Sequence, residues 1–128
     1  MSVQSALSAR HYTINSRVHS TKNSRALGNG RSFLNAKARA WLEAARQELR
    51  TQHKGKPLEG CYCVQLVIYY ADGRWNLDVD NAASGVLDSL KGIVVVDDSP
   101  TYISKLEVES RRSRQGKSYV DITLKEMK

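Results

Sequence analysis

Hydrophobic and polar positions alternate in three stretches of the chain, and this alternation predicts β-strands. The stretches are residues 9–18, 101–110 and 119–124, and a basic turn between the last two predicts that they form a hairpin. Residues 61–71 are instead dense in Val, Ile, Tyr and Cys, with apolar side chains on both faces of an extended backbone. That composition predicts a strand in the middle of the sheet.

Two further stretches repeat their apolar residues at helical spacing. The first is residues 35–52, where Asn35 can cap the helix and Trp41 lies on the apolar stripe. Trp41 is therefore predicted to be a core residue. The second predicted helix, around residues 82–90, contains Gly85, which lowers its intrinsic helix propensity.

Strand, helix, strand, helix and two strands follow one another along the chain, and this order predicts an α+β fold. We expect a single domain, residues 1–128, with a βαβαββ mixed sheet packed against two helices. The short apolar run 93–96 is predicted to be a buried strand. Residues 1–8 are predicted to be a loose end, and residues 19–31, rich in Ser, Asn, Gly and Arg, a flexible basic loop.

The composition is that of an ordinary globular domain, with 41% hydrophobic and 26% charged residues in a chain of 128. No apolar run approaches the roughly 18 residues needed to span a bilayer, so we expect no membrane segment. The two cysteines, Cys61 and Cys63, lie two residues apart on a predicted strand, a spacing that rarely allows a disulfide between them. We interpret them as small buried hydrophobes in a reducing compartment.

The net charge of +7 is concentrated in the first third of the chain. Residues 1–42 carry seven basic side chains and no acidic one, whereas basic and acidic side chains balance over the rest. An acid-free start also fits an organellar transit peptide, but removing it would delete part of a predicted helix. We therefore interpret the basic region as a surface for a polyanion, most simply a nucleic acid.

Four aspartates lie in two pairs, in Asp78-Val79-Asp80-Asn81 and Asp97-Asp98, on either side of the second predicted helix. Like charges this close repel one another unless a cation neutralises them, and Mg2+ prefers carboxylate oxygen. Each pair also has a simpler explanation: helix capping or a calcium-loop fragment for the first, and a turn for the second. Together they predict a metal site if the helix folds both pairs onto one edge of the sheet.

Acidic side chains that hold Mg2+ inside a basic protein are typical of nucleases. The metal lowers the pKa of a bound water and stabilises charge on the attacked phosphate. Basic residues around the acids then hold the polyanion. The DNA-binding candidates are Arg17, Lys22, Arg25, Arg31, Lys37, Arg74, Lys91, Arg111, Arg112 and Arg114.

The sequence resembles the RusA-type family of Holliday junction resolvases. The resemblance is carried by Asp78-Val79-Asp80-Asn81, Leu87-Asp88-Ser89-Leu90, Gly92, Val96-Asp97-Asp98 and Ile122-Thr123-Leu124. It implies a homodimer that cleaves four-way DNA junctions by paired symmetric nicks with Mg2+, or alternatively Mn2+. It also implies a cytoplasmic protein encoded by a bacterium or a phage. The essential acids would be Asp78, Asp80 and Asp98, with Asp97 beside them. Asp88, on the helix body, is expected to be structural or to support the metal ligands without binding the metal itself.

One position departs from the family pattern, because Ser84 stands where the family has a functional lysine. A lysine there would hold or polarise the scissile phosphate as a point charge. Its replacement leaves open a weaker enzyme, a different substrate geometry, or rescue by Lys91, Arg74 or a residue of the basic loop. The alternative functions are a branched-DNA-binding protein with weakened or lost catalysis, and a Ca2+-binding or polyanion-binding module unrelated to DNA.

Overall fold

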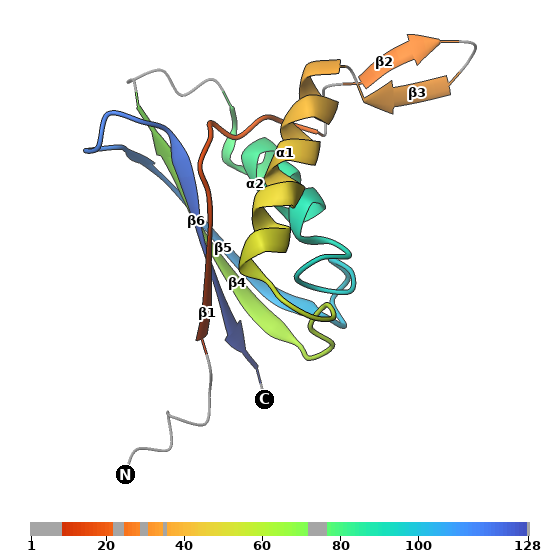
Figure 1. Ribbon diagram of the computed structural model, residues 1–128, viewed down its shortest axis with the longest axis vertical. Helices are drawn as coiled ribbons and strands as arrows, with labels where there is room; N and C mark the ends of the chain where they lie inside the picture. Colours follow the sequence, from red (N-terminus) through yellow and green to blue (C-terminus); the bar gives the residue numbers. More distant parts are fainter. Residues whose placement is uncertain (1–8, 22–24, 29–30, 35, 72–76, 128) are drawn as a thin grey trace.

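Four strands form one sheet, and two helices cover one of its faces (Figure 1). This computed structural model describes residues 9–21, 36–71 and 77–127, together with the backbone of residues 25–28 and 31–34. The elements are β1 (Ala9–Ile14), β2 (Arg25–Gly28), β3 (Arg31–Leu34), α1 (Ala36–Gln52), β4 (Tyr62–Tyr70), α2 (Val79–Leu90), β5 (Ile103–Arg112) and β6 (Tyr119–Glu126). Apart from the small β2–β3 sheet, this is the predicted α+β fold with its β-α-β-α-β-β order.

The strand order of the main sheet is β1-β6-β4-β5. β4 pairs in antiparallel fashion with β6 and in parallel with β5, so the predicted hairpin of the last two strands is wrong. The physical reason is burial: β4 is apolar at every position except Gln65 and occupies the centre, whereas β5 is largely exposed and lies at the edge. Residues 113–118 therefore connect β5 to β6 past the end of β4.

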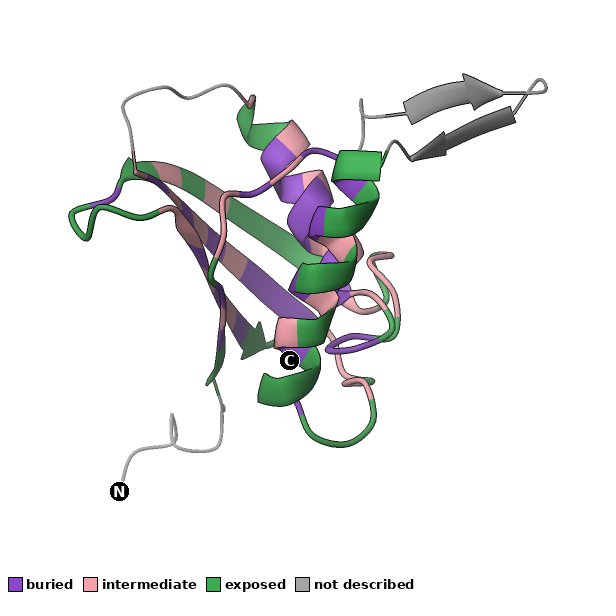
Figure 2. Cartoon of the chain, turned by 45° about the horizontal axis from the view of Figure 1, so that its top comes forward, coloured by how far each residue is buried: buried purple, intermediate pink, exposed green. Residues whose placement is uncertain are grey.

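The core lies between the sheet and the helices. Trp41 is buried on α1, as predicted, and its Nε1–H donates a hydrogen bond to Ser16 Oγ at 3.1 Å. Figure 2 shows the buried residues gathered where the helices face the sheet, with exposed and half-buried residues on the outer sides. Of the two cysteines, Cys63 is buried, Cys61 is half-buried, and both are free. No described helix combines the length and apolar character needed to cross a bilayer.

The predicted strand at residues 93–96 is wrong, although Val94 and Val95 are fully buried. The chain turns there instead, because Gly92 adopts a positive φ of 82° and the Val94 N–H donates to Leu90 O at 2.9 Å. Arg46 of α1 closes the same turn by donating to Lys91 O at 2.8 Å. A cation at the C-terminal end of α2 also complements the helix dipole.

Two strands replace part of the loop predicted for residues 19–31. β2 and β3 pair in antiparallel register from Arg25 opposite Leu34 to Gly28 opposite Arg31. The physical reason is the Asn-Gly sequence between the two short stretches, because Asn-Gly favours a β-hairpin turn. Residues 1–8, 22–24, 29–30 and 72–76 and the predicted cap Asn35 lie outside the described residues.

Gly85 has a packing role that helix propensity does not reveal. A Cβ atom at this position would collide with the backbone carbonyl of His19 and lie 3.5 Å from the Trp41 ring. The glycine therefore lets the segment after β1 pass directly against α2. That segment leads toward the basic β2–β3 hairpin.

We expect Gly85→Ala to lower the free energy of unfolding by about 1–3 kcal/mol, since overpacking a rigid backbone contact costs that much. Alanine favours the helix over glycine by up to about 1 kcal/mol, and the expected loss of stability is what remains after this gain. Urea unfolding followed by circular dichroism measures the change. Ser84→Ala is the matched control on α2 and should be neutral or slightly stabilising. An unchanged midpoint for Gly85→Ala would show that residues 15–21 move away without cost.

Candidate active site and nucleic-acid interface

Asp78 and Asp80 are exposed at the N-terminal end of α2. Asp78 occupies the N-cap position with an extended backbone, φ −63° and ψ 154°, and its carbonyl accepts the Ala82 N–H at 3.0 Å. Its carboxylate makes no capping hydrogen bond, however. Helix capping therefore does not account for this side chain, and the positive end of the helix dipole favours both anions here.

Asp80 borders an apolar groove of about 560 Å³ between α2 and β5. The other lining residues are Val79, Ala83, Ser84, Leu87, Leu106 and Val108. Two of these side chains are unusually open to solvent, with Val79 47% and Leu106 40% exposed. Ser84, one helical turn after Asp80, also lines this groove, at the position where the sequence resemblance implies a lysine. Clustered exposed apolar side chains are typical of an interaction surface.

The second pair of aspartates is associated with the opposite end of α2. Lys91 Nζ lies 3.7 Å from Asp98 Oδ1 and 3.9 Å from Asp88 Oδ1, directly after the last turn of the helix. A helix of 12 residues rises by about 17 Å from end to end. Asp98 is therefore held near the C-terminal end of α2, whereas Asp78 and Asp80 lie at its N-terminal end, and a metal site shared by both pairs stays a prediction. Among the described residues, no three His, Cys, Asp or Glu side chains form a group that could hold a metal.

Asp88 has the structural role expected of it. Its carboxylate accepts a hydrogen bond from the Thr21 hydroxyl, and Thr21 is buried although it is polar. This bond fixes the segment that passes Gly85 to the middle and end of α2. Arg46 also donates a hydrogen bond to the Asp88 carbonyl at 3.1 Å. Together the two hydrogen bonds hold α2 and the segment that leads to the basic hairpin in place.

The described basic candidates differ in their surroundings. Lys37 is exposed on α1, whereas Arg17 is half-buried with its guanidinium carbon 5.3 Å from the centroid of the Tyr70 ring. Lys91 lies between two carboxylates, so part of its charge is neutralised within the chain. The side chains of Lys22, Arg25, Arg31 and Arg74 lie outside the described residues.

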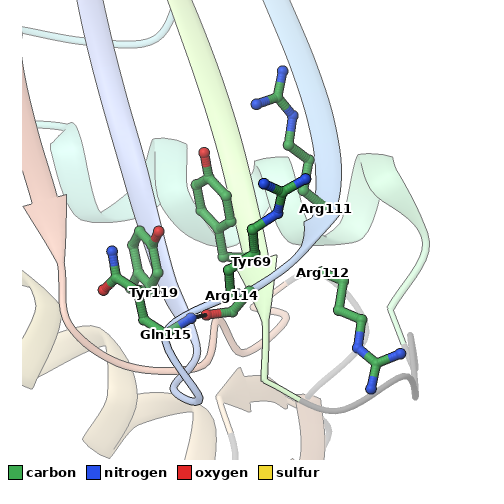
Figure 3. A pocket seen from close by; sticks show the side chains of 7 residues that line it. Tyr69, Arg111, Arg112, Arg114, Gln115 and Tyr119 are labelled. Atoms are coloured by element: carbon green, nitrogen blue, oxygen red, sulfur yellow. Dashed lines mark hydrogen bonds between the residues drawn. The ribbon is translucent and has the colours of Figure 1, made fainter.

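Arg111, Arg112 and Arg114 lie at the end of β5 and in the turn after it, and they line one cavity with Tyr69 and Tyr119. Figure 3 shows Arg111 and Arg114 beside the tyrosine rings, whereas Arg112 points away from them. Glu109 accepts two hydrogen bonds from Arg111, at 2.6 and 3.1 Å, and these hold the pKa of the Glu109 carboxyl below its usual value. Sequence reasoning missed the two tyrosines, because only the strand order places β6 beside β4. Their positions opposite each other in register could not be read from either strand alone.

Comparison with known families gives one match. Residues 14–123 match the family model described as endodeoxyribonuclease RusA, which covers most of the chain. The chain matches no curated protein sequence. The matched range contains both pairs of aspartates, both helices and the arginines at the end of β5.

Proposed function

Because the chain belongs to the RusA endodeoxyribonuclease family, we propose that it resolves four-way DNA junctions by paired symmetric nicks with Mg2+, or with Mn2+ in its place. The family itself comprises endodeoxyribonucleases that act on branched DNA. Membership of this family therefore directly supports nuclease activity on DNA. The proposal adds the metal, the symmetry of the nicks, a homodimer and a cytoplasmic location in a bacterium or the host of a phage.

The observation that carries the proposal is the exposed pair Asp78 and Asp80 at the start of α2. The Asp78 carboxylate is not used for capping, although it sits at the cap position. Carboxylate oxygens are the ligands that Mg2+ prefers, so this pair offers part of a magnesium site. The bound ion would activate a water and stabilise charge at the scissile phosphate.

The chain's own residues supply the remaining requirements. Asp78 and Asp80 are held at the helix end, where the dipole stabilises negative charge. Arg112 and Arg114 are exposed at the end of β5 and can hold phosphates of the same DNA. Asp97 and Asp98 remain candidate ligands, although Lys91 and the length of α2 separate them from the first pair in one chain.

The apolar groove beside Asp80 supports a homodimer. Val79 and Leu106 expose 47% and 40% of their surface there, and β5 is an edge strand of the sheet. A second copy seated on this groove would cover the apolar side chains and bring acidic residues of two chains close together. Two-fold symmetry would also supply two identical sites for two symmetric nicks.

The direct test is cleavage of a labelled four-way junction by the purified protein. We expect paired nicks in opposite strands with Mg2+ or Mn2+, and no nicks in EDTA. A linear duplex of the same sequence should be cut much more slowly. Intact junctions in both metals would contradict the proposal.

Ser84 favours one alternative, a junction-binding protein whose catalysis is weakened or lost. We expect Ser84→Lys to increase the nicking rate by about tenfold or more, since a cation near the phosphate is worth more than 1.4 kcal/mol in favourable geometry. Rates measured at saturating DNA separate catalysis from tighter binding. The matched control, Ala44→Lys, adds the same charge at an exposed position of α1.

The two functions give different results in this experiment. An active wild type that Ser84→Lys accelerates supports a weakened enzyme of the proposed kind. An inactive wild type that binds junctions and gains nicking in Ser84→Lys supports the alternative. Equal nicking rates in wild type and Ser84→Lys would show that another cationic side chain already binds the scissile phosphate.

A further inference from the structure

Tyr69 and Tyr119 form a stacked pair on the helix-free face of the sheet (Figure 3). Tyr69 lies on β4 and Tyr119 lies directly opposite it on β6. Their ring centroids are 4.4 Å apart and the rings are nearly parallel, with an interplanar angle of 13°. Both side chains are half-buried, so part of each ring remains open to solvent.

These rings line a cavity of about 780 Å³ at the end of the sheet. The turn after β5 supplies the rest of the lining: Arg111, Arg112, Ser113, Arg114 and Gln115. A cavity of this size falls within the roughly 300–1,000 Å³ typical of small-ligand sites. Its chemistry is aromatic on one side and strongly basic on the other.

The charge of the cavity is only partly compensated. Glu109 binds Arg111 through two hydrogen bonds, which fixes that guanidinium beside Tyr69. Arg114 is exposed, and no ion pair among the described residues involves it. Arg112 lies opposite the buried Tyr70 and points away from the tyrosine rings (Figure 3). Arginine is well suited to phosphate, because its planar group donates several hydrogen bonds at once.

We propose that Tyr69 and Tyr119, together with Arg111 and Arg114, form a binding site for an unpaired nucleotide of DNA. The base lies against the tyrosine rings and the adjacent phosphates bind the arginines. Bases within a duplex have both faces covered by their neighbours, so only an unstacked base can use an aromatic surface. The inference rests on the proposed function in one respect, namely that the ligand is DNA.

Position in the fold is consistent with this assignment. Tyr69 is near the end of β4, and only eight residues separate it from Asp78. A strand bound at the tyrosines would therefore lie at the same end of β4 from which the chain leaves toward the acidic pair. A branch point, where strands exchange partners, is a place where a nucleotide can leave its stack.

The test measures binding in EDTA, so it is independent of cleavage. Fluorescence anisotropy gives the affinity for a labelled oligothymidylate and for a duplex of equal length at one salt concentration. We expect the double variant Tyr69→Leu/Tyr119→Leu to bind the single strand about tenfold or more weakly, and the duplex within about twofold of wild type. Unchanged single-strand affinity in a folded double variant would overturn the proposal.

Charge variants separate stacking from electrostatics. Arg111→Gln/Arg114→Gln should weaken binding to both DNAs and reduce the salt slope for the single strand by about 1.4, which corresponds to two phosphate contacts. The matched control, Arg50→Gln/Lys54→Gln, removes two exposed charges at the end of α1 and after it, and should leave the affinity within about twofold. Equal losses in both pairs would overturn the site.

A second measurement on the wild type avoids any effect of the variants on folding. Photo-crosslinking to an oligothymidylate that contains 5-iododeoxyuridine, followed by peptide mass spectrometry, should place an adduct on Tyr69 or Tyr119. Adducts found only elsewhere would overturn the proposal. Crosslinking at the tyrosines by a protein that cuts no junction would sustain this site while refuting the proposed nuclease. Normal junction cutting by the tyrosine variant, together with unchanged single-strand binding, would refute this site while supporting the proposed nuclease.

Discussion

Asp80→Asn is expected to lower the rate of junction nicking by at least about 100-fold, because it removes a metal-binding charge worth roughly 3 kcal/mol or more at the reacting phosphate. Asp80 is exposed in the first turn of α2, next to Asp78 and at the edge of the groove. The substitution keeps the shape of the side chain. It changes the helix-dipole interaction by only about 0.3–1 kcal/mol, so the fold should persist.

Asp121→Asn is the control for this substitution. Asp121 lies on β6, where it accepts a hydrogen bond from Thr13 Oγ1 at 3.3 Å, and it carries no proposed role in cleavage. Single-turnover nicking with Mg2+ and the thermal midpoint are measured for both variants. Nicking by Asp80→Asn at the rate of Asp121→Asn would remove Asp80 from the active site.

Leu106→Glu is expected to raise the dissociation constant of the homodimer by about 100-fold or more, since an unpaired charge buried in an apolar interface costs several kcal/mol. Leu106 is 40% exposed in the groove beside Asp80. Its substitution in a monomer should cost little stability, because the side chain already faces solvent in part. Sedimentation equilibrium measures the dissociation constant directly.

Mg2+ binding should fall together with dimer formation. The described carboxylates of one chain do not gather into a metal group, so under the proposed function we expect the second chain to add ligands to the site. Titration calorimetry at protein concentrations above and below the dissociation constant tests this coupling. Wild-type affinity for Mg2+ that does not depend on protein concentration would argue against a shared site.

Met127→Glu provides a closely matched control for Leu106→Glu. Met127 is 39% exposed, follows β6 and lies outside the groove, and it undergoes the same apolar-to-acidic change. It should leave the dissociation constant and the nicking rate within about twofold of wild type, as expected for a surface change away from the interface. Equal dissociation in both variants would show that the groove is not the dimer interface.

The parts of the fold predicted correctly are those that depend on local periodicity. The apolar stripe of α1 and the apolar run of β4, interrupted only by Gln65, both identify their element without reference to the rest of the chain. Residues 93–96 show the limit of that reasoning, because an apolar run can be buried in a turn as well as in a strand. Gly92, in its positive-φ conformation, decided between the two.

For a similar reason, the candidate site could be predicted only in part from the sequence. The two aspartate pairs are visible in the sequence, and the spacing around Asp78 and Asp80 carries the family resemblance. The distance between the two pairs cannot be read from the sequence, because it depends on where the turn after α2 places Asp98. Lys91, placed between Asp88 and Asp98, shows that this turn keeps the second pair at the far end of the helix.

The sequence by itself determined the helices, most of the strands, the excess of basic charge and the identity of the acidic residues, since these follow from composition and short-range periodicity. Only the tertiary structure decided that β6 lies beside β4, that Tyr69 therefore stacks on Tyr119, and that α2 separates the two aspartate pairs. Strand order is set by which segment gains most from burial at the centre of the sheet. That gain depends on all the competing strands together and cannot be read from any one of them.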